Sequence, residues 1–466
     1  MDRIENRTFD ELKIGDTASL VHTLTYKDVE LFAVMSGDVN PAHVDPAFAK
    51  DDLFHKIVAH GMWGGALFST VLGTELPGPG TIYLGQSLRF RRPVGLGDTI
   101  TVTVRVAEKA SEKHRVTLDC EAKNQAGETV ITGTAEVIAP IEKISRARVM
   151  LPEVELRERG RWYRQLIEMT RELEPIRTAV VHPVDSVSLV GAIDAAREQL
   201  IVPVLVGPER KIRAAAENAK LDLAPYELVS TEHSAAAAVE AVALARAGKV
   251  QALMKGAIAT DELMHAVDDP EKGLRTGRRM SHVSAMDVPG YPRPLFITDA
   301  AINIYPTLEE KRDIVQNAID LLHALGLPSP NVAILSALET VTRTIRSTVD
   351  AAAICKMADR GQITGGIIDG PLGFDAAVSE EAAKTKGIVS PVAGKADIFV
   401  VPDLEAGNML AKQLEYLAEA ETAGIVLGAR VPIALTSRSD KALARLSSSA
   451  LALLWAHHQQ ASRPAA

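Results

Sequence analysis

The chain has 466 residues, which at the usual size of about 150 residues per domain corresponds to about three globular units. Hydrophobic residues make up 47% and charged residues 24%, the balance of an ordinary folded protein, so a disordered or fibrous chain is excluded. Lys and Arg number 51 against 60 Asp and Glu, giving a net charge of -9, and a general surface for nucleic acid or anionic membrane is therefore not expected. Any anion site must be local.

Cysteine usage and the apolar runs indicate the compartment. The two cysteines, Cys120 and Cys355, lie far apart and form no CxxC pair, so neither a disulfide framework nor a cysteine-based zinc site is expected. The first residues, MDRIENRTFDELKIGD, are charged, and apolar runs such as VPVLVG are too short to span a bilayer. The sequence therefore predicts a cytoplasmic protein with no membrane or nucleic-acid partner.

The first part of the chain, residues 1–145, has the pattern of an antiparallel sheet around a helix. Polar and apolar residues alternate over residues 99–106, as in a strand with one buried face. Residues 124–127 join two further strand-like runs as a hairpin would. The stretch at residues 60–76 has a long apolar face with few charges, which a helix enclosed by a sheet requires. We expect an α+β domain in which a curled sheet encloses one helix.

The rest of the chain, residues 175–466, reads differently. Short β-rich runs alternate with amphipathic helices, and the strands lack polar alternation, which is typical of parallel strands covered by helices on both faces. This part is expected to form an α/β fold of two subdomains with a cleft between them. Between the two parts, residues 146–174 are rich in Arg and Glu and are expected to form a charged linker, with a connecting helix over residues 160–174.

The segment SGDVNPAHVD, residues 36–45, places two titratable groups on one loop. Asn40-Pro41 forces an extended or turn conformation, so Asp38 and His43 can both project from it and share a water molecule. Adding water across a conjugated C=C bond needs a base and an acid, which such a pair provides. Charge then grows on the thioester oxygen, and the backbone N–H of Gly61, at the start of the apolar helix, is placed to stabilise it.

These residues carry a resemblance. SGDVNPAHVDPAFA, IVAHGM and the stretch from LFSTVLGTEL to GLGDTI resemble the MaoC-like, (R)-specific enoyl-CoA hydratases over nearly all of residues 10–140. The resemblance implies a hot-dog fold, units that pair as dimers, and enoyl-CoA as substrate. It assigns Asp38 and His43 as the catalytic pair, Gly61 as the oxyanion donor, and Ser69 and Asn40 as residues that support substrate binding.

A plainer interpretation of the same loop stays open. Asp38 and Asn40 are common turn formers, and a single His in such a loop is often structural. Asp45 is expected to cap the helix that begins at Pro46. Loss of enoyl absorbance with crotonyl-CoA separates the two interpretations, since only a hydratase would depend on Asp38.

The second part of the chain has three stretches dense in Gly, Ser and Lys beside apolar runs, at residues 252–262, 365–408 and 432–454. Each follows the end of an expected strand, where ligands bind in open α/β sheets. Neither GxxxxGK[ST] nor GxGxxG after a strand occurs, so the usual signatures of nucleotide hydrolysis and dinucleotide redox chemistry are missing. Ser437-Arg438 opens a helix, where backbone N–H groups and a guanidinium can hold an oxyanion.

DGPLGFDAA, SPVAGKADI and VPDLEAGN make residues 160–460 resemble the phosphate acetyl- and butyryltransferases. The resemblance implies direct attack of the CoA thiolate on an acyl phosphate, with no acyl-enzyme. By carry-over, Ser437 holds the thiol and Arg438 binds the phosphate or the acyl oxygen. Lys255, Arg278 and Arg279 are further candidates for phosphate binding.

One position departs from this pattern. The acetyl-type family places an acidic base seven residues after the serine, and here Ala444 occupies that position, whereas Asp440 lies three residues after it, as in the butyryl-type pattern. Asp440 could therefore promote thiolate formation. Alternatively, this half could be a degenerate module that only binds acyl-CoA or drives assembly.

The sequence thus predicts a homo-oligomeric fusion of two acyl-CoA enzymes. Acyl-CoA, enoyl-CoA and phosphate or acyl phosphate are expected as substrates, with neither a bound cofactor nor a metal-ligand cluster. Asp375 and Glu405 can equally be helix caps or acids of a first helical turn, and Cys355 is expected to be a packed residue of a helix.

Overall fold

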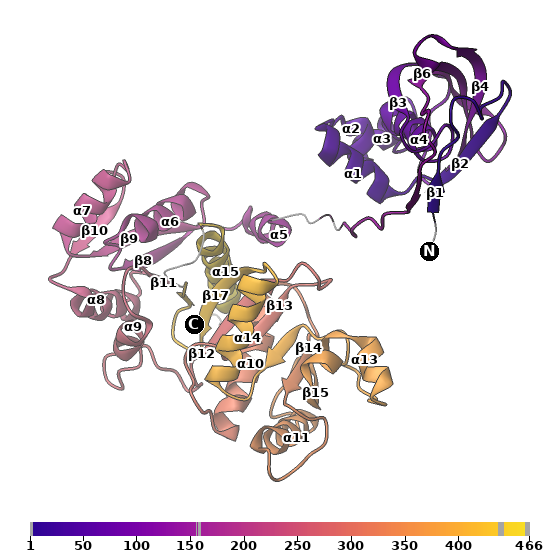
Figure 1. Cartoon of the computed structure of the whole chain (residues 1–466). Helices are drawn as coiled ribbons and strands as arrows, with labels where there is room; N and C mark the ends of the chain where they lie inside the picture. The colour runs from indigo at the N-terminus through magenta and orange to yellow at the C-terminus, as the bar shows by residue number, and fades with distance from the viewer. Residues whose placement is uncertain (1–2, 155, 157–159, 437–441, 462–466) are drawn as a thin grey trace. The chain divides into compact units, whose positions relative to one another are not determined.

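The computed structural model describes residues 3–154, 156, 160–436 and 442–461. The chain forms two compact units, Met1–Arg157 and Glu158–Ala466, which Figure 1 shows in the colours of the chain from indigo to yellow. Each unit has its own sheet and its own hydrophobic core. They are described in turn.

The first unit is built on a five-stranded antiparallel sheet that encloses a helix, the hot-dog arrangement expected from the sequence. The helix is α4 (Gly61–Thr74). In spatial order the strands are β2 (Thr17–Thr23), β4 (Thr99–Ala110), β5 (Arg115–Lys123), β6 (Thr129–Ile138) and β3 (Ile82–Phe90). A separate two-stranded sheet pairs β1 (Arg3–Glu5) with β7 (Ser145–Ala147), and a 3-10 turn, η1 (Glu112–His114), links β4 to β5.

The alternation of apolar and polar residues along β4 gives the strand one buried face, as predicted. Ile100, Val102, Val104 and Val106 are all at most 1% exposed, while the threonines between them are only partly buried. The predicted hairpin at residues 124–127 joins β5 to β6. Successive side chains of a strand point to opposite faces, so one apolar face of the sheet covers α4.

Helix α4 lies close against this sheet because its first turns carry small residues. Trp63, Phe68 and Leu72 are buried, and a Cβ added at Gly65 would lie 2.9 Å from the side chain of Leu88 on β3. Glycine therefore permits an approach that alanine would obstruct.

The core of the first unit depends on Phe68, which is 0% exposed. Phe68→Ala is expected to lower the free energy of unfolding of this unit by about 3–5 kcal/mol. The surrounding core can fill only part of the space that the removed ring leaves. Hydrogen exchange of peptides from β4 to β6 measures the change in this unit separately. Phe48→Ala is the control, since Phe48 is 50% exposed. Equal losses in the two variants would contradict the assignment of Phe68 to the core.

Three short helices connect β2 to α4 and carry the predicted loop. They are α1 (Tyr26–Ser36), α2 (Pro41–Val44) and α3 (Pro46–Asp51). The helix predicted to begin at Pro46 is confirmed, and so is its cap, because Oδ1 of Asp45 accepts hydrogen bonds from the backbone N–H groups of Ala47 and Phe48 at 2.9 and 3.1 Å.

The second unit is an α/β fold around one eleven-stranded sheet. Its strands, in spatial order, are β10 (Glu227–Ser230), β9 (Ile201–Gly207), β8 (Ile176–Val181), β11 (Ala252–Lys255), β18 (Ile433–Ala434), β17 (Glu421–Leu427), β12 (Ser281–Asp287), β13 (Leu295–Thr298), β16 (Ile398–Val400), β14 (Asn331–Leu335) and β15 (Ile367–Leu372). The predicted parallel pairing is confirmed on both sides of a central antiparallel stretch.

The two expected subdomains share this sheet. One apolar cluster surrounds β8, β9 and β11, another surrounds β13, β14 and β16, and a third extends across both groups of strands. The covering helices are α6 (Ser186–Arg197), α7 (Glu209–Asn218), α8 (Ser234–Arg246), α9 (Thr260–Val267), α10 (Leu308–Ala324), α11 (Arg346–Asp359), α12 (Phe374–Val378), α13 (Glu380–Thr385) and α14 (Leu404–Leu417).

The two parallel groups run in opposite directions. β18 and β17, β17 and β12, and β12 and β13 are three successive antiparallel pairs. Because the strand direction reverses at each pair, β13 runs opposite to β18. The carboxyl ends of β11 and β18 therefore lie at the sheet edge opposite to those of β15 and β16. The three Gly-rich stretches, each predicted at a strand end, are divided between these two edges.

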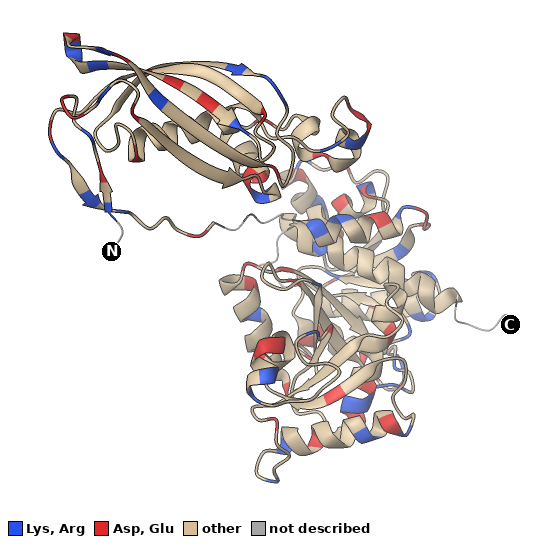
Figure 2. Ribbon diagram, turned by 90° about the vertical axis from the view of Figure 1, so that its right-hand side faces the viewer, with Lys and Arg blue, Asp and Glu red and all other residues tan. Residues whose placement is uncertain are grey.

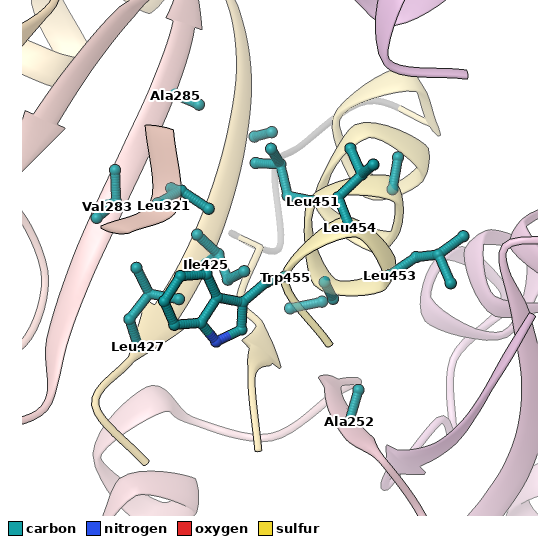
Figure 3. Packing of buried hydrophobic residues seen from close by; sticks show 14 of the residues in the cluster. Ala252, Val283, Ala285, Leu321, Ile425, Leu427, Leu451, Leu453, Leu454 and Trp455 are labelled. Carbon is teal, nitrogen blue, oxygen red and sulfur yellow. The ribbon is translucent and has the colours of Figure 1, made fainter. Parts of the chain in front are cut away.

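Helix α15 (Ala442–Ala461) is buried over most of its length. Figure 3 shows the Trp455 indole lying against Ile425 and Leu427 of β17, with Leu321 of α10 nearby. A helix that is apolar on most sides belongs in the middle of a large core, and this position fits α15.

The predicted connecting segment, residues 146–174, differs from the linker expected. Its start, β7, belongs to the first unit. Its helix forms as α5 (Arg161–Thr170) and is part of the second unit, because Trp162 and Leu166 are buried in the core beside α15. These two apolar residues recur with helical spacing among the charges, and burying them attaches the helix to the core.

Charged residues are interspersed over both units, as Figure 2 shows. Examples are the cross-strand pair of Arg115 and Glu136 at 3.1 Å and the helical pair of Arg213 and Glu209 at 2.7 Å. Such exposed pairs each contribute at most about 1 kcal/mol to stability. Within the described residues, none of the helices is both long and apolar enough to cross a bilayer.

Candidate active sites

The predicted loop of the first unit is held by its own turn chemistry. Helix α1 ends at Gly37, whose φ of 75° is in the left-handed region and whose N–H donates to the carbonyl of Ala33 at 2.8 Å. The side-chain oxygen of Asn40 accepts a hydrogen bond from the N–H of Ala42 at 3.1 Å and so caps α2. As a result Asp38 lies just before α2 and His43 lies on it.

His43 is oriented by one hydrogen bond. Its Nδ1 lies 2.8 Å from the carbonyl oxygen of Val58, and because a carbonyl only accepts, this nitrogen carries the proton. The neutral ring therefore has its lone pair on Nε2. A lone pair fixed in this way is what a general base needs.

A second imidazole, that of His60, lies against the first. The ring centroids of His43 and His60 are 4.0 Å apart, and Nε2 of His60 donates to the backbone carbonyl of Asp38 at 3.0 Å. One nitrogen from each histidine and one carboxylate oxygen of Asp38 all lie within 4.8 Å of one another. The structure thus brings the predicted pair together and adds His60, the histidine of IVAHGM, which was not among the predicted site residues.

A cavity of about 320 Å³ lies beside these groups. Its lining includes His43, His60, Gly61, Phe90 and Ile131, which are mostly apolar or aromatic. Gly61 is the first residue of α4, where backbone N–H groups have no partner within the helix. The cavity therefore combines an apolar wall, an imidazole lone pair and a helix N-terminus.

The two predicted substrate-binding residues of this unit do not line this cavity, and their roles in substrate binding remain predictions. Ser69 is exposed on α4, two helical turns beyond Gly61, and does not line the cavity. Asn40 is exposed and its side chain caps α2. The structure thus shows Asn40 shaping the loop that carries Asp38.

In the second unit, a buried cation lies at the end of β11. Lys255 is 4% exposed, and its Nζ donates to the carbonyl of Thr436 at 3.2 Å. Arg445 of α15 is also 4% exposed, and its guanidinium donates to Oγ1 of Thr436 at 3.0 Å. The end of β8 lies alongside, since Nδ1 of His182 donates to the carbonyl of Ala257 at 2.9 Å.

Thr436 therefore accepts hydrogen bonds from two buried cationic side chains. Arg445 was not among the predicted site residues. Its sequence context, ALARLSSS, gives a helical position beside apolar residues but no sign that the guanidinium is buried.

The predicted residues Ser437, Arg438 and Asp440 lie outside the described residues. They follow Thr436 directly in the chain. Ala444, the position where the acetyl-type pattern has an acid, is on α15 and is 7% exposed.

The other phosphate-binding candidates contact acidic or amide groups. Arg278 is paired with Asp320, and Arg279 donates to the side-chain oxygen of Asn303 at 2.7 Å and lies 3.4 Å from Glu310. Both arginines precede β12, so they lie at the opposite edge of the sheet from the carboxyl end of β11. Their predicted role in binding phosphate remains a prediction.

Three further predictions concern helices. Asp375 and Glu405 are acids in the first turns of α12 and α14, one of the two predicted alternatives. Cys355 is on α11 as expected and is partly buried, and desolvation raises the pKa of its thiol to about 11. A thiol with such a pKa is a poor nucleophile at neutral pH, which agrees with a packing role.

Comparison with known proteins establishes the relationship of both units. A family model described as MaoC like domain matches residues 14–128, and one described as phosphate acetyl/butaryl transferase matches residues 230–453. The chain is 60% identical to the phosphate acetyltransferase of Rhizobium meliloti over 314 residues, 66% of this chain and 99% of that protein. The chain belongs to the phosphate acetyl/butyryltransferase family. In this transferase the family's domain follows a MaoC-like domain.

Further relatives and solved structures are similar to one or the other unit. The chain is 40% identical to the phosphate butyryltransferase of Clostridium beijerinckii over 290 residues, 62% of this chain and 96% of that one. A branched-chain phosphotransacylase from Enterococcus faecalis is 31% identical with a TM-score of 0.54, and the match covers 60% of this chain and 99% of that one. The R-hydratase PhaJ1 of Pseudomonas aeruginosa is 44% identical over 33% of this chain and 99% of its own, with a TM-score of 0.33.

Proposed function

We propose that the first unit hydrates trans-2-enoyl-CoA to (R)-3-hydroxyacyl-CoA. The observation that carries this proposal is the hydrogen bond from Nδ1 of His43 to Val58, which leaves the lone pair of the neutral ring on Nε2. A ring nitrogen of His43 lies within 4.8 Å of a carboxylate oxygen of Asp38, and His43 lines the cavity. Water gives its oxygen to C3 of the substrate and one proton to the pair of Asp38 and His43, and the pair returns a proton to C2. The N–H of Gly61 stabilises the negative charge on the thioester oxygen.

The second unit is a phosphate acetyl/butyryltransferase domain, and we propose that it transfers an acyl group between CoA and phosphate. The thiolate sulfur bonds to the acyl carbon as the bond from that carbon to the phosphate oxygen breaks, and the reverse reaction makes acyl phosphate. Lys255 and Arg445 support this role, because their hydrogen bonds fix Thr436, which directly precedes Ser437 in the chain. Ser437, Arg438 and Asp440 follow in sequence, as proposed holders of thiol, phosphate and proton.

Both activities can be measured on the intact chain. Loss of enoyl absorbance with crotonyl-CoA reports hydration, and chiral separation of the product reports its hand. Release of CoA from acetyl-CoA or butyryl-CoA in the presence of phosphate reports acyl transfer. Hydration without acyl transfer, together with intact acyl-CoA binding, would favour the alternative of a degenerate second module, which the alanine at position 444 suggests.

We also propose that the first unit pairs through β3 in a cytoplasmic homo-oligomer. β3 is an edge strand of the sheet, and Ile82, Leu84 and Phe90 along it are 57, 45 and 52% exposed. An edge strand has backbone N–H and C=O groups that can form hydrogen bonds with a strand of another chain, and exposed apolar side chains favour such pairing. Light scattering of the intact chain tests for the oligomer.

We expect hydration to depend on the absence of a side chain at Gly61 as well as on the position of its N–H. A Cβ at this residue would lie 3.1 Å from Cζ of Phe90, inside the cavity wall. Gly61→Ala should lower kcat/KM for crotonyl-CoA about tenfold or more, since small displacements of a reacting group are costly. Adding Phe90→Leu should restore part of the loss.

Gly73→Ala on the same helix is the matched control, because nothing lies within 4 Å of its added Cβ. An unchanged kcat/KM in Gly61→Ala would show that the helix start does not contact the reacting thioester.

A further inference from the structure

The two histidines of the first unit carry their lone pairs on atoms with defined positions. Nε2 of His60 donates to the Asp38 carbonyl, so in the neutral ring Nδ1 is the bare nitrogen. In His43 the arrangement is reversed, with Nδ1 donating and Nε2 bare. Two imidazoles therefore each offer one unprotonated nitrogen, and both are held in that tautomer by a backbone carbonyl.

The bare nitrogen of His60 has an unusual environment. His60 is only 3% exposed, and its Nδ1 is buried with no hydrogen-bond partner. A buried polar atom without a partner carries a desolvation penalty, so a group that binds its lone pair is favoured there.

The third member of the cluster adds a negative charge. A carboxylate oxygen of Asp38 and one nitrogen of each histidine lie within 4.8 Å of one another. Two imidazole nitrogens and one carboxylate oxygen form a donor set that suits zinc and similar divalent metals. In a tetrahedral site with bonds of about 2 Å, the ligand atoms are about 3.3 Å apart. Asp38 is exposed, and its Oδ1 accepts a hydrogen bond from the N–H of Asn40 at 3.2 Å, so its other carboxylate oxygen is the candidate ligand.

Backbone carbonyl groups around these residues hold the two histidine rings in place. A metal-binding histidine usually donates its second nitrogen to a carbonyl or carboxylate, which fixes the ring and raises its basicity. Here both histidines already have such bonds, to Val58 and to Asp38. The backbone thus orients two ligands before a metal arrives.

We propose that Asp38, His43 and His60 form a binding site for a divalent transition metal such as Zn²⁺, and that the bound metal inhibits hydration. The site uses three protein ligands and leaves a fourth position for water. Its inhibitory effect rests on the proposed function of the first unit. The metal takes the lone pair of His43 and the carboxylate of Asp38, which proton transfer needs, and acyl transfer in the second unit is unaffected.

The test uses the intact chain freed of metal with a chelator. Co²⁺ serves as a spectroscopic probe, and its visible absorption and calorimetric titration give the stoichiometry and affinity. One site per chain is expected, with affinity weakened about tenfold or more in Asp38→Asn, His43→Gln and His60→Gln. His55→Gln is the matched control, because His55 is an exposed histidine of the same unit that bonds to the carbonyl of Lys50.

The same protein is then assayed with Zn²⁺ at saturation of this site. Crotonyl-CoA hydration should fall in the wild-type chain and recover with chelator, while acyl transfer stays constant and reports an intact fold. Undetectable Co²⁺ binding, or equal binding in the three variants and wild type, would overturn the site. Hydration that continues with the site saturated would overturn the inhibition. If Co²⁺ binds at these residues but the metal-free chain does not hydrate crotonyl-CoA, the metal site stands and the proposed hydratase function fails.

Discussion

His43→Gln and Asp38→Asn are each expected to lower the rate of crotonyl-CoA hydration about 10²–10⁴-fold, the range that general acid–base catalysis contributes. Glutamine lacks the imidazole lone pair beside the cavity, and asparagine lacks the carboxylate charge. Because the two groups act on the same water molecule, the double variant should be little slower than either single variant. Absorbance assays on the intact chain measure all three rates.

Acyl transfer is the internal control for these variants. CoA release from acyl-CoA and phosphate should stay at the wild-type rate, because the residues concerned belong to a separate compact unit. His55→Gln provides the second control, as its exposed ring bonds to a backbone carbonyl outside the cluster. A hydration rate in either dyad variant that equals the wild-type rate would remove this pair from the mechanism.

Lys255→Met is expected to reduce acyl phosphate formation about 10²–10³-fold, the loss typical when one donor to a developing charge is removed. Methionine has a similar length and keeps the core filled, but it lacks the cation that bonds to the carbonyl of Thr436. The bond that fixes the chain directly before Ser437 is then lost. Initial rates of CoA release at varied phosphate concentration separate an effect on KM from one on kcat.

Lys249→Met is the matched control, since Lys249 is an exposed lysine just before β11. It should leave acyl transfer unchanged, and both variants should retain hydration. If Lys255→Met transfers acyl groups at the wild-type rate and unfolds at the wild-type temperature, the buried cation has no part in the second site.

Local features of the fold followed from local patterns. The alternation over residues 99–106 defined β4 and its buried face, and the Asp45-Pro46 pair defined the start of α3. The Gly-Asp-x-Asn-Pro-x-His spacing placed Asp38 and His43 on one loop, because Gly37, Asn40 and Pro41 each favour a particular backbone conformation. In each case the residues that determine the structure are neighbours in the chain.

Other features depended on residues far apart in the sequence. In the second unit, strands that lack polar alternation and alternate with helices predicted parallel pairing. The reversal at β17 and β12, which divides the Gly-rich stretches between two edges, is decided by strand pairing. The position of Ser69, exposed on α4 and outside the lining of the cavity, is likewise decided by the packing of that helix. Short-range periodicity carries no information on either point.

By itself, the amino-acid sequence determined two folds, their order, and the loop that carries Asp38 and His43. Only the tertiary structure placed His60 against that pair and Arg445 beside Lys255 and Thr436. The physical reason is burial: a histidine or an arginine is usually exposed, and it becomes part of a site when the packing of distant segments removes it from water and leaves a fixed set of partners.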